Sequence, residues 1–211
     1  MAVQNELMPN PEKYKPTLTH AFLKLLQDKE KLSFTVTQNI DDLEKHIGVT
    51  SLSQVHGSFT RPIKCINRSC DFQTNDVKML NYCAADVAVC HCPVCGCLLR
   101  PGVVFFGEGV NGSLTDYELR LKKCDLFITM GTSLQVGPVN VIPSLAKAAK
   151  ITSILMNREK VGAFEDELSA LDSIDTTVLG VCKELGWEED LQKIYKEAQT
   201  KVIEKPVKIK Q

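Results

Sequence analysis

The hydrophobic pattern near the start of the chain changes period twice, and each change predicts a new element. Residues 16–26 carry apolar side chains at helical spacing, and their leading proline suits the first turn of a helix. Residues 32–37 form a short run of β-branched and aromatic side chains, which predicts a strand. Leu43 and Ile47 return to helical spacing, and Gly48 suits the left-handed turn that ends a helix.

Further along the chain, short continuous apolar runs predict buried strands, because they are too short for helices. These runs are residues 103–106, 125–130 and 151–156. A helix is expected over residues 138–149, and a charged helix is expected from Glu188 onward. Strands that alternate with helices are typical of an α/β protein with a Rossmann-like, doubly wound parallel sheet.

Small or polar residues follow three of the expected strands, at the point where each strand must end. Open α/β sheets bind ligands just outside the carboxyl ends of their strands, so these positions predict a nucleotide site at one edge of the sheet. Each group alone is ordinary, since Asn-x-Asp and Gly-Thr-Ser are common in turns. The groups are Gln38, Asn39 and Asp41; Gly131, Thr132 and Ser133; and Asn157, Arg158 and Glu159.

His56 is the candidate for proton transfer beside the first of these groups. A histidine has an ordinary pKa of about 6.5, so it can accept a proton near neutral pH. Gly57 and the hydroxyl of Ser58 follow it directly. A lone histidine before glycine is more often a surface residue, and the nearby polar cluster is what favours a catalytic role.

Length and composition fit one domain, or one domain with a modest insertion. The chain has 211 residues, of which 44% are hydrophobic and 24% are charged, and its formal net charge is −1. This balance gives no bulk attraction to nucleic acid or to an anionic membrane. No apolar run reaches the roughly 18 residues of a membrane span, and the first residues lack the regions of a secretory signal. We therefore expect a cytoplasmic or nuclear protein.

The cysteines are clustered, and the clustering indicates a metal site. Seven of the nine lie within residues 65–97, and an odd number without a secretory signal argues against a disulfide framework. Cys65 with Cys70, and Cys92 with Cys95, have the spacing of a structural zinc site with four thiolate ligands. Such a site is closed to substrate and organises structure. The alternative ligands are Cys90, Cys97 and the more distant Cys83.

Together these motifs resemble those of the sirtuins, the NAD-dependent protein-lysine deacylases. Thr-Gln-Asn-Ile-Asp at residues 37–41 is followed by the short helix and by His56-Gly57, in the family's order. The cysteine pairs match the family's inserted zinc module, and residues 103–108, Val-Val-Phe-Phe-Gly-Glu, follow that module as they do in class I sirtuins. The resemblance implies NAD as co-substrate, structural Zn²⁺, and an acyl-lysine protein or peptide as substrate.

The resemblance also implies roles for the candidate residues. His56 would act as general base, while Asn39 and Asp41 would position the nicotinamide ribose for attack by the acetyl oxygen of lysine. The products would be free lysine, nicotinamide and O-acetyl-ADP-ribose. The substrate would contact Phe106, Gly107 and Glu108. The NAD contacts would be Gln38, Asn39, Ile40, Asp41, Gly131, Thr132, Ser133, Asn157, Arg158, Glu159 and Cys182, with Cys182 ending a further strand over residues 177–182.

Sirtuins hold the diphosphate with a glycine-rich stretch, Gly-Ala-Gly-x-Ser, and no such stretch opens this chain. The resemblance therefore covers roughly the C-terminal three quarters of a sirtuin core, and the expected sheet is incomplete at its N-terminus. We expect a Rossmann-like NAD-binding domain in residues 1–59 and 103–195, a zinc-binding module in residues 60–102, and a basic, disordered tail in residues 196–211.

An alternative function follows from the absent glycine-rich stretch. The chain would then be a catalytically impaired, sirtuin-like protein that contains zinc and binds a peptide or partner without turnover. A zinc module that binds nucleic acid has little support, because the cysteine segment has few basic residues and no interleaved aromatic side chains.

Overall fold

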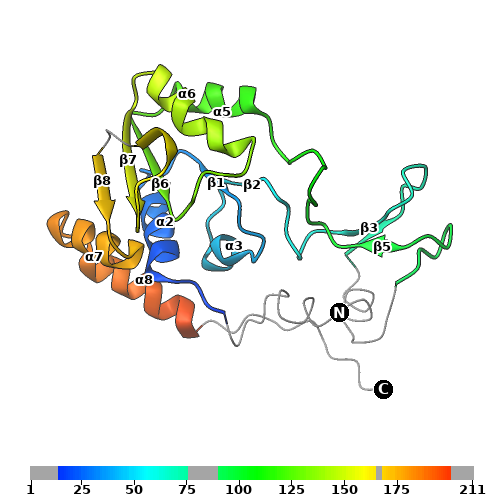
Figure 1. Cartoon of the computed structure of the whole chain (residues 1–211). Coiled ribbons are helices and arrows are strands. Elements are labelled where there is room, and N and C mark those ends of the chain that lie inside the picture. The colour runs from blue at the N-terminus through cyan, green and yellow to red at the C-terminus, as the bar shows by residue number, and fades with distance from the viewer. Residues whose placement is uncertain (1–13, 76–89, 165–167, 201–211) are drawn as a thin grey trace.

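The computed structural model describes residues 14–75, 90–164 and 168–200 (Figure 1). Two parallel sheets lie in this part of the chain. One has the order β6-β7-β8, with β6 at Leu126–Met130, β7 at Thr152–Asn157 and β8 at Leu168–Leu171. The other pairs β1 (Thr35–Thr37) with β2 (Leu52–Gln54). The strands expected within residues 32–37, 125–130 and 151–156 are confirmed as β1, β6 and β7.

Helices cover both faces of these sheets (Figure 1). The helices α2, α7 and α8 pack on one face, and α5 and α6 pack on the other. Within the described residues, the helices are α2 (Leu18–Asp28), α3 (Leu43–Ile47), α5 (Leu114–Leu121), α6 (Ile142–Ala148), α7 (Ile174–Glu184) and α8 (Glu188–Thr200), and the 3₁₀ turns are η1 (Val139–Val141) and η2 (Gly162–Phe164).

The two parallel sheets share the same two cores. On the α2 side, Leu52 of β2 and Ile128 of β6 pack in one cluster around the buried Phe22. On the α5 side, Val36 of β1 and Phe127 of β6 pack in the other cluster. Successive side chains of a strand point to opposite faces, so β6 contributes to both cores. The result is a three-layer α/β arrangement.

A third, antiparallel sheet stands beside this layer (Figure 1). Its order is β4-β3-β5, with β3 at Ile63–Cys65, β4 at Gln73–Thr74 and β5 at Leu99–Arg100. The strands are only two or three residues long and have little apolar material between them. A sheet this small needs a cross-link, which the cysteines of this segment can supply through a metal ion.

The early helices and strands agree with the sequence pattern. The helix α2 places its apolar stripe on the sheet, and Ala21, Phe22 and Leu25 are buried. His20 accepts a hydrogen bond at Nδ1 from the backbone N–H of Thr17 at 3.1 Å, so it helps to cap this helix. The short helix α3 ends at Gly48, whose φ of 97° is left-handed as expected.

Two expected strands are wrong. Residues 103–106 form no strand: Val103 makes a single bridge with Gly57, and Phe106 is 99% exposed. Residues 177–182 lie inside α7, because their apolar side chains follow helical spacing and Val178 and Cys182 share its buried side. An apolar run alone cannot separate a buried strand from a helix or from an exposed turn.

The expected disordered tail is also wrong in part. Residues 196–200 belong to α8, which packs against α2 through the buried Leu191 and Ala198. Residues 201–211 lie outside the described part of the chain. Across residues 14–75, 90–164 and 168–200, none of the helices has the length and apolar character needed to cross a bilayer.

Candidate active site

The loops after β1 and β2 bring His56 against the backbone of Gln38. The Nδ1 atom of His56 lies 3.0 Å from the carbonyl oxygen of Gln38. A carbonyl oxygen only accepts, so Nδ1 carries a proton, and in the neutral form of the imidazole the lone pair is on Nε2. The side chain of His56 is half-buried. The backbone contact therefore prepares His56 to take a proton at Nε2.

The segment between β1 and α3 carries the other expected catalytic residues. Asn39 is exposed, and its backbone N–H donates to Thr37 Oγ1 at 3.2 Å. Asp41 Oδ1 accepts the backbone N–H of Leu43 at 3.2 Å, at the start of α3. The Ile40 carbonyl accepts the Phe59 N–H at 3.4 Å, which ties the segment to the loop after His56.

Gln38 also joins the β1 loop to the loop after β6. Thr132 Oγ1 donates to Gln38 Oε1 at 3.2 Å, across a sequence separation of 94 residues. Asn157, at the end of β7, donates from Nδ2 to the carbonyl oxygens of Thr132 at 3.2 Å and Glu159 at 3.0 Å. The loops that end β1, β6 and β7 are thus linked by side-chain amides and a hydroxyl. This convergence was expected from the polar groups at the strand ends.

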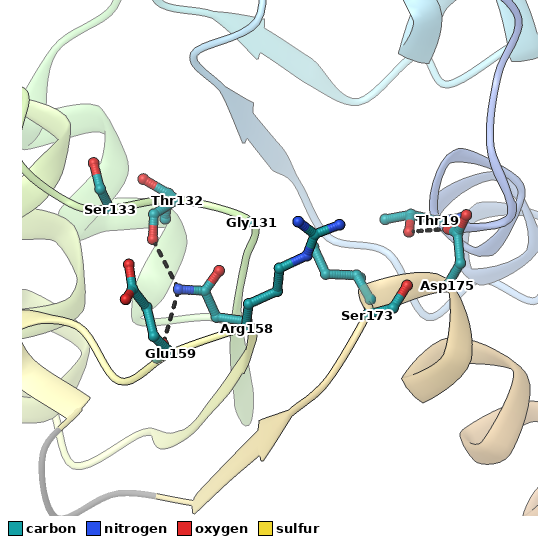
Figure 2. A pocket seen from close by; sticks show the side chains of 10 residues that line it. Thr19, Gly131, Thr132, Ser133, Arg158, Glu159, Ser173 and Asp175 are labelled. Carbon is teal, nitrogen blue, oxygen red and sulfur yellow. Dashed lines mark hydrogen bonds between the residues drawn. The ribbon is translucent and has the colours of Figure 1, made fainter.

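A cavity of about 450 Å³ opens beside these loops (Figure 2). Figure 2 shows Arg158 extended across it toward Thr19 and Asp175. Thr19 of α2 donates to Asp175 Oδ1 from its backbone N–H at 2.8 Å and from Oγ1 at 2.5 Å. Cavities of this size suit small organic ligands. Its lining residues are Thr19, Gly131, Thr132, Ser133, Asn157, Arg158, Glu159, Ser173, Ile174 and Asp175.

Asp42 fixes the loop that carries Asn39 and Asp41. It is 1% exposed and adopts a left-handed conformation with φ of 64°. Gln54 Nε2 donates to its Oδ1 at 2.6 Å, and Thr60 Oγ1 donates to its Oδ2 at 2.7 Å. Burial alone would raise the pKa of Asp42, but these hydrogen bonds hold the pKa below its usual value. The ionised Asp42 carboxylate therefore binds residues on both sides of His56, Gln54 before it and Thr60 after it.

We expect Asp42→Asn to lower the free energy of unfolding at neutral pH by roughly 1–3 kcal/mol, because the charge-assisted hydrogen bonds weaken. The pKa of Asp42 is lower in the folded protein than in the unfolded chain, so its contribution exists above the unfolded value of about 3.9 and disappears as pH falls through the folded value. Urea unfolding at about pH 7 and about pH 3 measures this. The exposed Asp125→Asn is the control, and an equal loss for Asp42→Asn at both pH values would contradict the expectation.

Gly57 allows the His56 loop to pass close to the segment after the cysteine-rich sheet. Its φ is 73°, and a Cβ there would lie 2.1 Å from the carbonyl oxygen of Gly102. Val104 N–H donates to the His56 carbonyl at 2.8 Å beside this approach. No side chain other than hydrogen fits between the two backbones.

We expect Gly57→Ala to destabilise the protein more than Gly186→Ala does. Both glycines have positive φ, but a Cβ at Gly186 meets nothing within 4 Å. The free energy of unfolding of Gly186→Ala should therefore fall by only about 1–2 kcal/mol, from backbone strain alone. The difference between their urea midpoints measures the steric clash at Gly57. Equal midpoints would contradict this expectation, because they would show that the Gly57 loop can move away from Gly102 without loss of stability.

The four expected cysteine ligands meet in one cluster. The Sγ atoms of Cys65, Cys70, Cys92 and Cys95 all lie within 4.8 Å of one another. Cys65 and Cys95 are 3.4 Å apart at sulfur, and Cys70 and Cys92 are 3.7 Å apart. Four sulfurs about 2.3 Å from a central zinc ion lie about 3.8 Å from one another, so the cluster fits tetrahedral zinc. Cys90 and Cys97 are not among these four, and Cys83 lies outside the described residues.

The pKa values of the clustered thiols are consistent with a site that binds a cation. Burial raises the pKa of Cys65 to about 12, while the backbone N–H of Cys97 lowers the pKa of Cys95 to about 6. Hydrogen bonds among the sulfurs add to this difference, since they raise the pKa of Cys65 and lower the pKa of Cys95. A divalent ion would hold all four as thiolates. The residues therefore fit a structural zinc ion with no open position.

Phe106, Gly107 and Glu108 form an exposed turn shortly after Val104, which contacts the His56 backbone. Gly107 has φ of 86°, and the backbone N–H of Glu108 donates to the Phe105 carbonyl at 3.1 Å. Arg100 pairs with Glu108 and lowers the pKa of this carboxyl to about 2. The turn presents aromatic surface and backbone groups to solvent, as a peptide-binding element would.

Residues 1–138 match the family model described as the Sir2 family. The chain belongs to the Sir2 family. Among curated relatives, this Sir2-family chain is 37% identical over 198 residues to the NAD-dependent protein deacetylase hst2 of Schizosaccharomyces pombe, covering 90% of the chain and 57% of that protein. It is 37% identical over 202 residues to hst2-1 of Emericella nidulans, covering 93% of the chain and 54% of that protein. The chain thus spans just over half the length of these two relatives.

Solved sirtuin structures share the fold of this Sir2-family chain. A complex described as Sir2, p53 peptide and NAD⁺ superposes with a TM-score of 0.74 at 25% identity, covering 83% of this chain and 72% of that one. Sir2Tm bound to a propionylated peptide gives a TM-score of 0.71 at 27% identity, covering 83% and 73%. The expected fold class, an α/β sirtuin fold with a cysteine module, is confirmed.

Sequence reasoning missed one wall of the cavity in this Sir2-family chain. Ser173, Ile174 and Asp175 follow β8 at the start of α7 and line the cavity. The same rule that found the other loops, polar residues after a strand, would have found them had residues 168–171 been recognised as a strand. Cys182, expected at this end of the site, is instead fully buried in α7 and is not part of the lining.

Proposed function

We propose that this Sir2-family chain acts as an NAD-dependent protein-lysine deacetylase, with NAD as co-substrate and nicotinamide and O-acetyl-ADP-ribose as products. The observation that carries the proposal is the contact between His56 Nδ1 and the Gln38 carbonyl, which leaves Nε2 as a base. The same Gln38 reaches Thr132 of the cavity wall. A proton acceptor and a ligand cavity are therefore joined through one residue.

In this proposal each part of the site has a separate task. The cavity with Ser133, Arg158 and Glu159 binds the adenosine half of NAD. Asn39 and Asp41 hold the nicotinamide ribose, and His56 removes a proton from a ribose hydroxyl at Nε2. The acetyl oxygen of the substrate lysine attacks the anomeric carbon as nicotinamide leaves. The turn of Phe106, Gly107 and Glu108 binds the peptide main chain, which favours acyl-lysine substrates of varied sequence.

Nicotinamide release tests the proposal directly. The protein is incubated with NAD and either an acetyl-lysine peptide or its unmodified counterpart, and nicotinamide and O-acetyl-ADP-ribose are quantified by chromatography. We expect both products only with the acetylated peptide. No products above the protein-free background would contradict the proposal.

A second candidate, a zinc-containing protein that binds a peptide without turnover, is favoured by one observation. The residues that line the cavity come from α2 and the ends of β6, β7 and β8, and they do not include Asn39, Asp41 or His56. This candidate predicts that acetyl-lysine peptide binds in calorimetry while NAD leaves the melting temperature unchanged. The deacetylase proposal predicts that NAD raises it.

We also propose a cytoplasmic or nuclear location, because a cluster of four unpaired thiols is suited to a reducing compartment. Fluorescence microscopy of the tagged full chain tests this, and a secretory or surface distribution would contradict it.

A further inference from the structure

The side chain of Arg100, in strand β5, contacts three residues of the segment that follows it. Its guanidinium forms a two-pronged ion pair with Glu108, with Nη1 contacting Oε1 and Nη2 lying 2.7 Å from Oε2. The Nη2 atom also donates to the Val103 carbonyl at 2.6 Å. The guanidinium carbon lies 4.6 Å from the centre of the Phe105 ring. Bidentate pairs of this kind fix geometry as well as charge.

Glu108, which is held by Arg100, makes the hydrogen bonds that fix the turn. Its Oε2 accepts the backbone N–H of Phe105 at 2.9 Å, and its own N–H donates to the Phe105 carbonyl. The side chains of Phe105 and Phe106 are 52% and 99% exposed, so little packing holds the turn in place. Its conformation therefore depends on the carboxylate, and the carboxylate depends on Arg100.

Arg100 itself is placed by the strands that carry the cysteines. In the register of β3 and β5, Cys65 is opposite Leu99 and Lys64 is opposite Arg100. The Leu99 N–H donates to the Cys90 carbonyl at 2.8 Å, which ties β5 to the segment before Cys92. Since these strands are so short, the sulfur cluster is what keeps β5, and with it Arg100, in position.

The other end of the contact chain reaches His56. Arg100 holds the Val103 carbonyl, Val103 bridges to Gly57, and Val104 N–H donates to the His56 carbonyl. Contacts therefore connect Arg100 to the exposed turn and to the backbone of His56, and strand β5 connects it to the four-cysteine cluster.

We propose that Arg100 is a positioning residue that couples the order of the four-cysteine cluster to the substrate turn, residues 105–108, and to the backbone that carries His56. The part concerning substrate rests on the proposed function. Loss of the cluster's metal then loosens the turn through Arg100, while the cavity around Arg158 stays as it is because its lining residues belong to other elements.

Hydrogen exchange of the zinc-loaded full chain tests the coupling without any activity measurement. We expect Arg100→Met to keep the zinc content of the wild type while its amides in residues 104–108 exchange about tenfold faster. Chelation of zinc from the wild type should produce a similar increase, and chelation of Arg100→Met should add little. The matched control is Arg120→Met. Arg120 lies on α5, outside the cysteine-rich sheet, and its guanidinium carbon is 3.9 Å from the centre of the Phe34 ring.

Unchanged exchange at residues 104–108 in Arg100→Met would overturn the proposal, as would an equal further increase when zinc is removed from that variant. Glu108→Gln provides a second variant that leaves the cysteine strands untouched and should loosen the same amides. If Arg100→Met misfolds, unchanged exchange in Glu108→Gln overturns the proposal in its place.

Binding of an acetyl-lysine peptide separates this inference from the proposed function. Arg100→Met should raise the KM for the peptide about tenfold and leave the KM for NAD unchanged, as expected for a residue that acts through the substrate turn. If the wild type shows the zinc-dependent exchange but neither binds nor turns over the peptide, the coupling stands and the proposed function fails. A change in the KM for NAD alone would overturn the assignment of Arg100 to the substrate side.

Discussion

His56→Ala is expected to reduce acetyl-lysine-dependent nicotinamide release by about 10²- to 10⁴-fold in kcat, the range that a positioned general base contributes. The structure supplies the reason: Nδ1 is committed to the Gln38 carbonyl at 3.0 Å, so Nε2 is the nitrogen that can accept a proton. Alanine removes this acceptor and leaves the loop backbone in place. Initial rates at saturating NAD and peptide measure the effect.

Two controls make the His56 result specific. His46→Ala removes a histidine on α3, close in sequence and outside the proposed catalytic group, and should retain the wild-type rate. The thermal shift caused by NAD should persist in His56→Ala, because the cavity residues are unchanged. A His56→Ala variant that keeps more than about a tenth of the wild-type rate with this shift intact would remove His56 from the role of base.

Cys92→Ser is expected to release zinc and to unfold the antiparallel sheet of β3, β4 and β5. Structural zinc sites in small peptides supply about 10–16 kcal/mol of binding free energy, which is also folding free energy. The three strands are two or three residues long and cannot replace that energy by packing. Zinc content by mass spectrometry and amide exchange over residues 63–74 and 90–100 measure the loss.

Cys97→Ser is the matched control for the zinc prediction. Cys97 lies two residues after the ligand Cys95 but is not among the four clustered sulfurs, so its serine variant should bind zinc as the wild type does. Equal zinc loss in the two variants would show that the ligand set differs from the four cysteines that the structure brings together.

Several elements were predictable because their signals are local. The helix α3 is set by Leu43 and Ile47 at helical spacing and by Gly48, which alone among residue types adopts left-handed φ without cost. The strands β6 and β7 are mainly apolar runs that lie between two layers of helices, as parallel strands usually do. The polar groups that follow these strands were therefore placed correctly at one edge.

The strand predictions failed where segments of similar composition differ in how deeply the folded protein buries them. Residues 103–106 are as apolar as β6, but they form a single β-bridge, at Val103, and Phe105 packs on Arg100 instead of in a core. Strand β8 has the opposite problem: Leu168 and Leu171 are 65% and 47% exposed, so its pattern is weak and the cavity residues after it were overlooked. Burial depends on how the elements pack, so an apolar run in the sequence predicts burial only as a statistical tendency.

By itself the sequence determined the parallel α/β class, the four cysteines and the presence of polar residues after the strands, because each of these depends on side-chain type and on spacing over a few residues. Only the tertiary structure decided which nitrogen of His56 is the base, that Gln38 meets Thr132, and that Arg100 holds Glu108. Those contacts join loops from separate elements, and their geometry is set by how the sheets and helices pack. No local pattern along the chain encodes that packing, so the chemistry of the site appears only in the folded molecule.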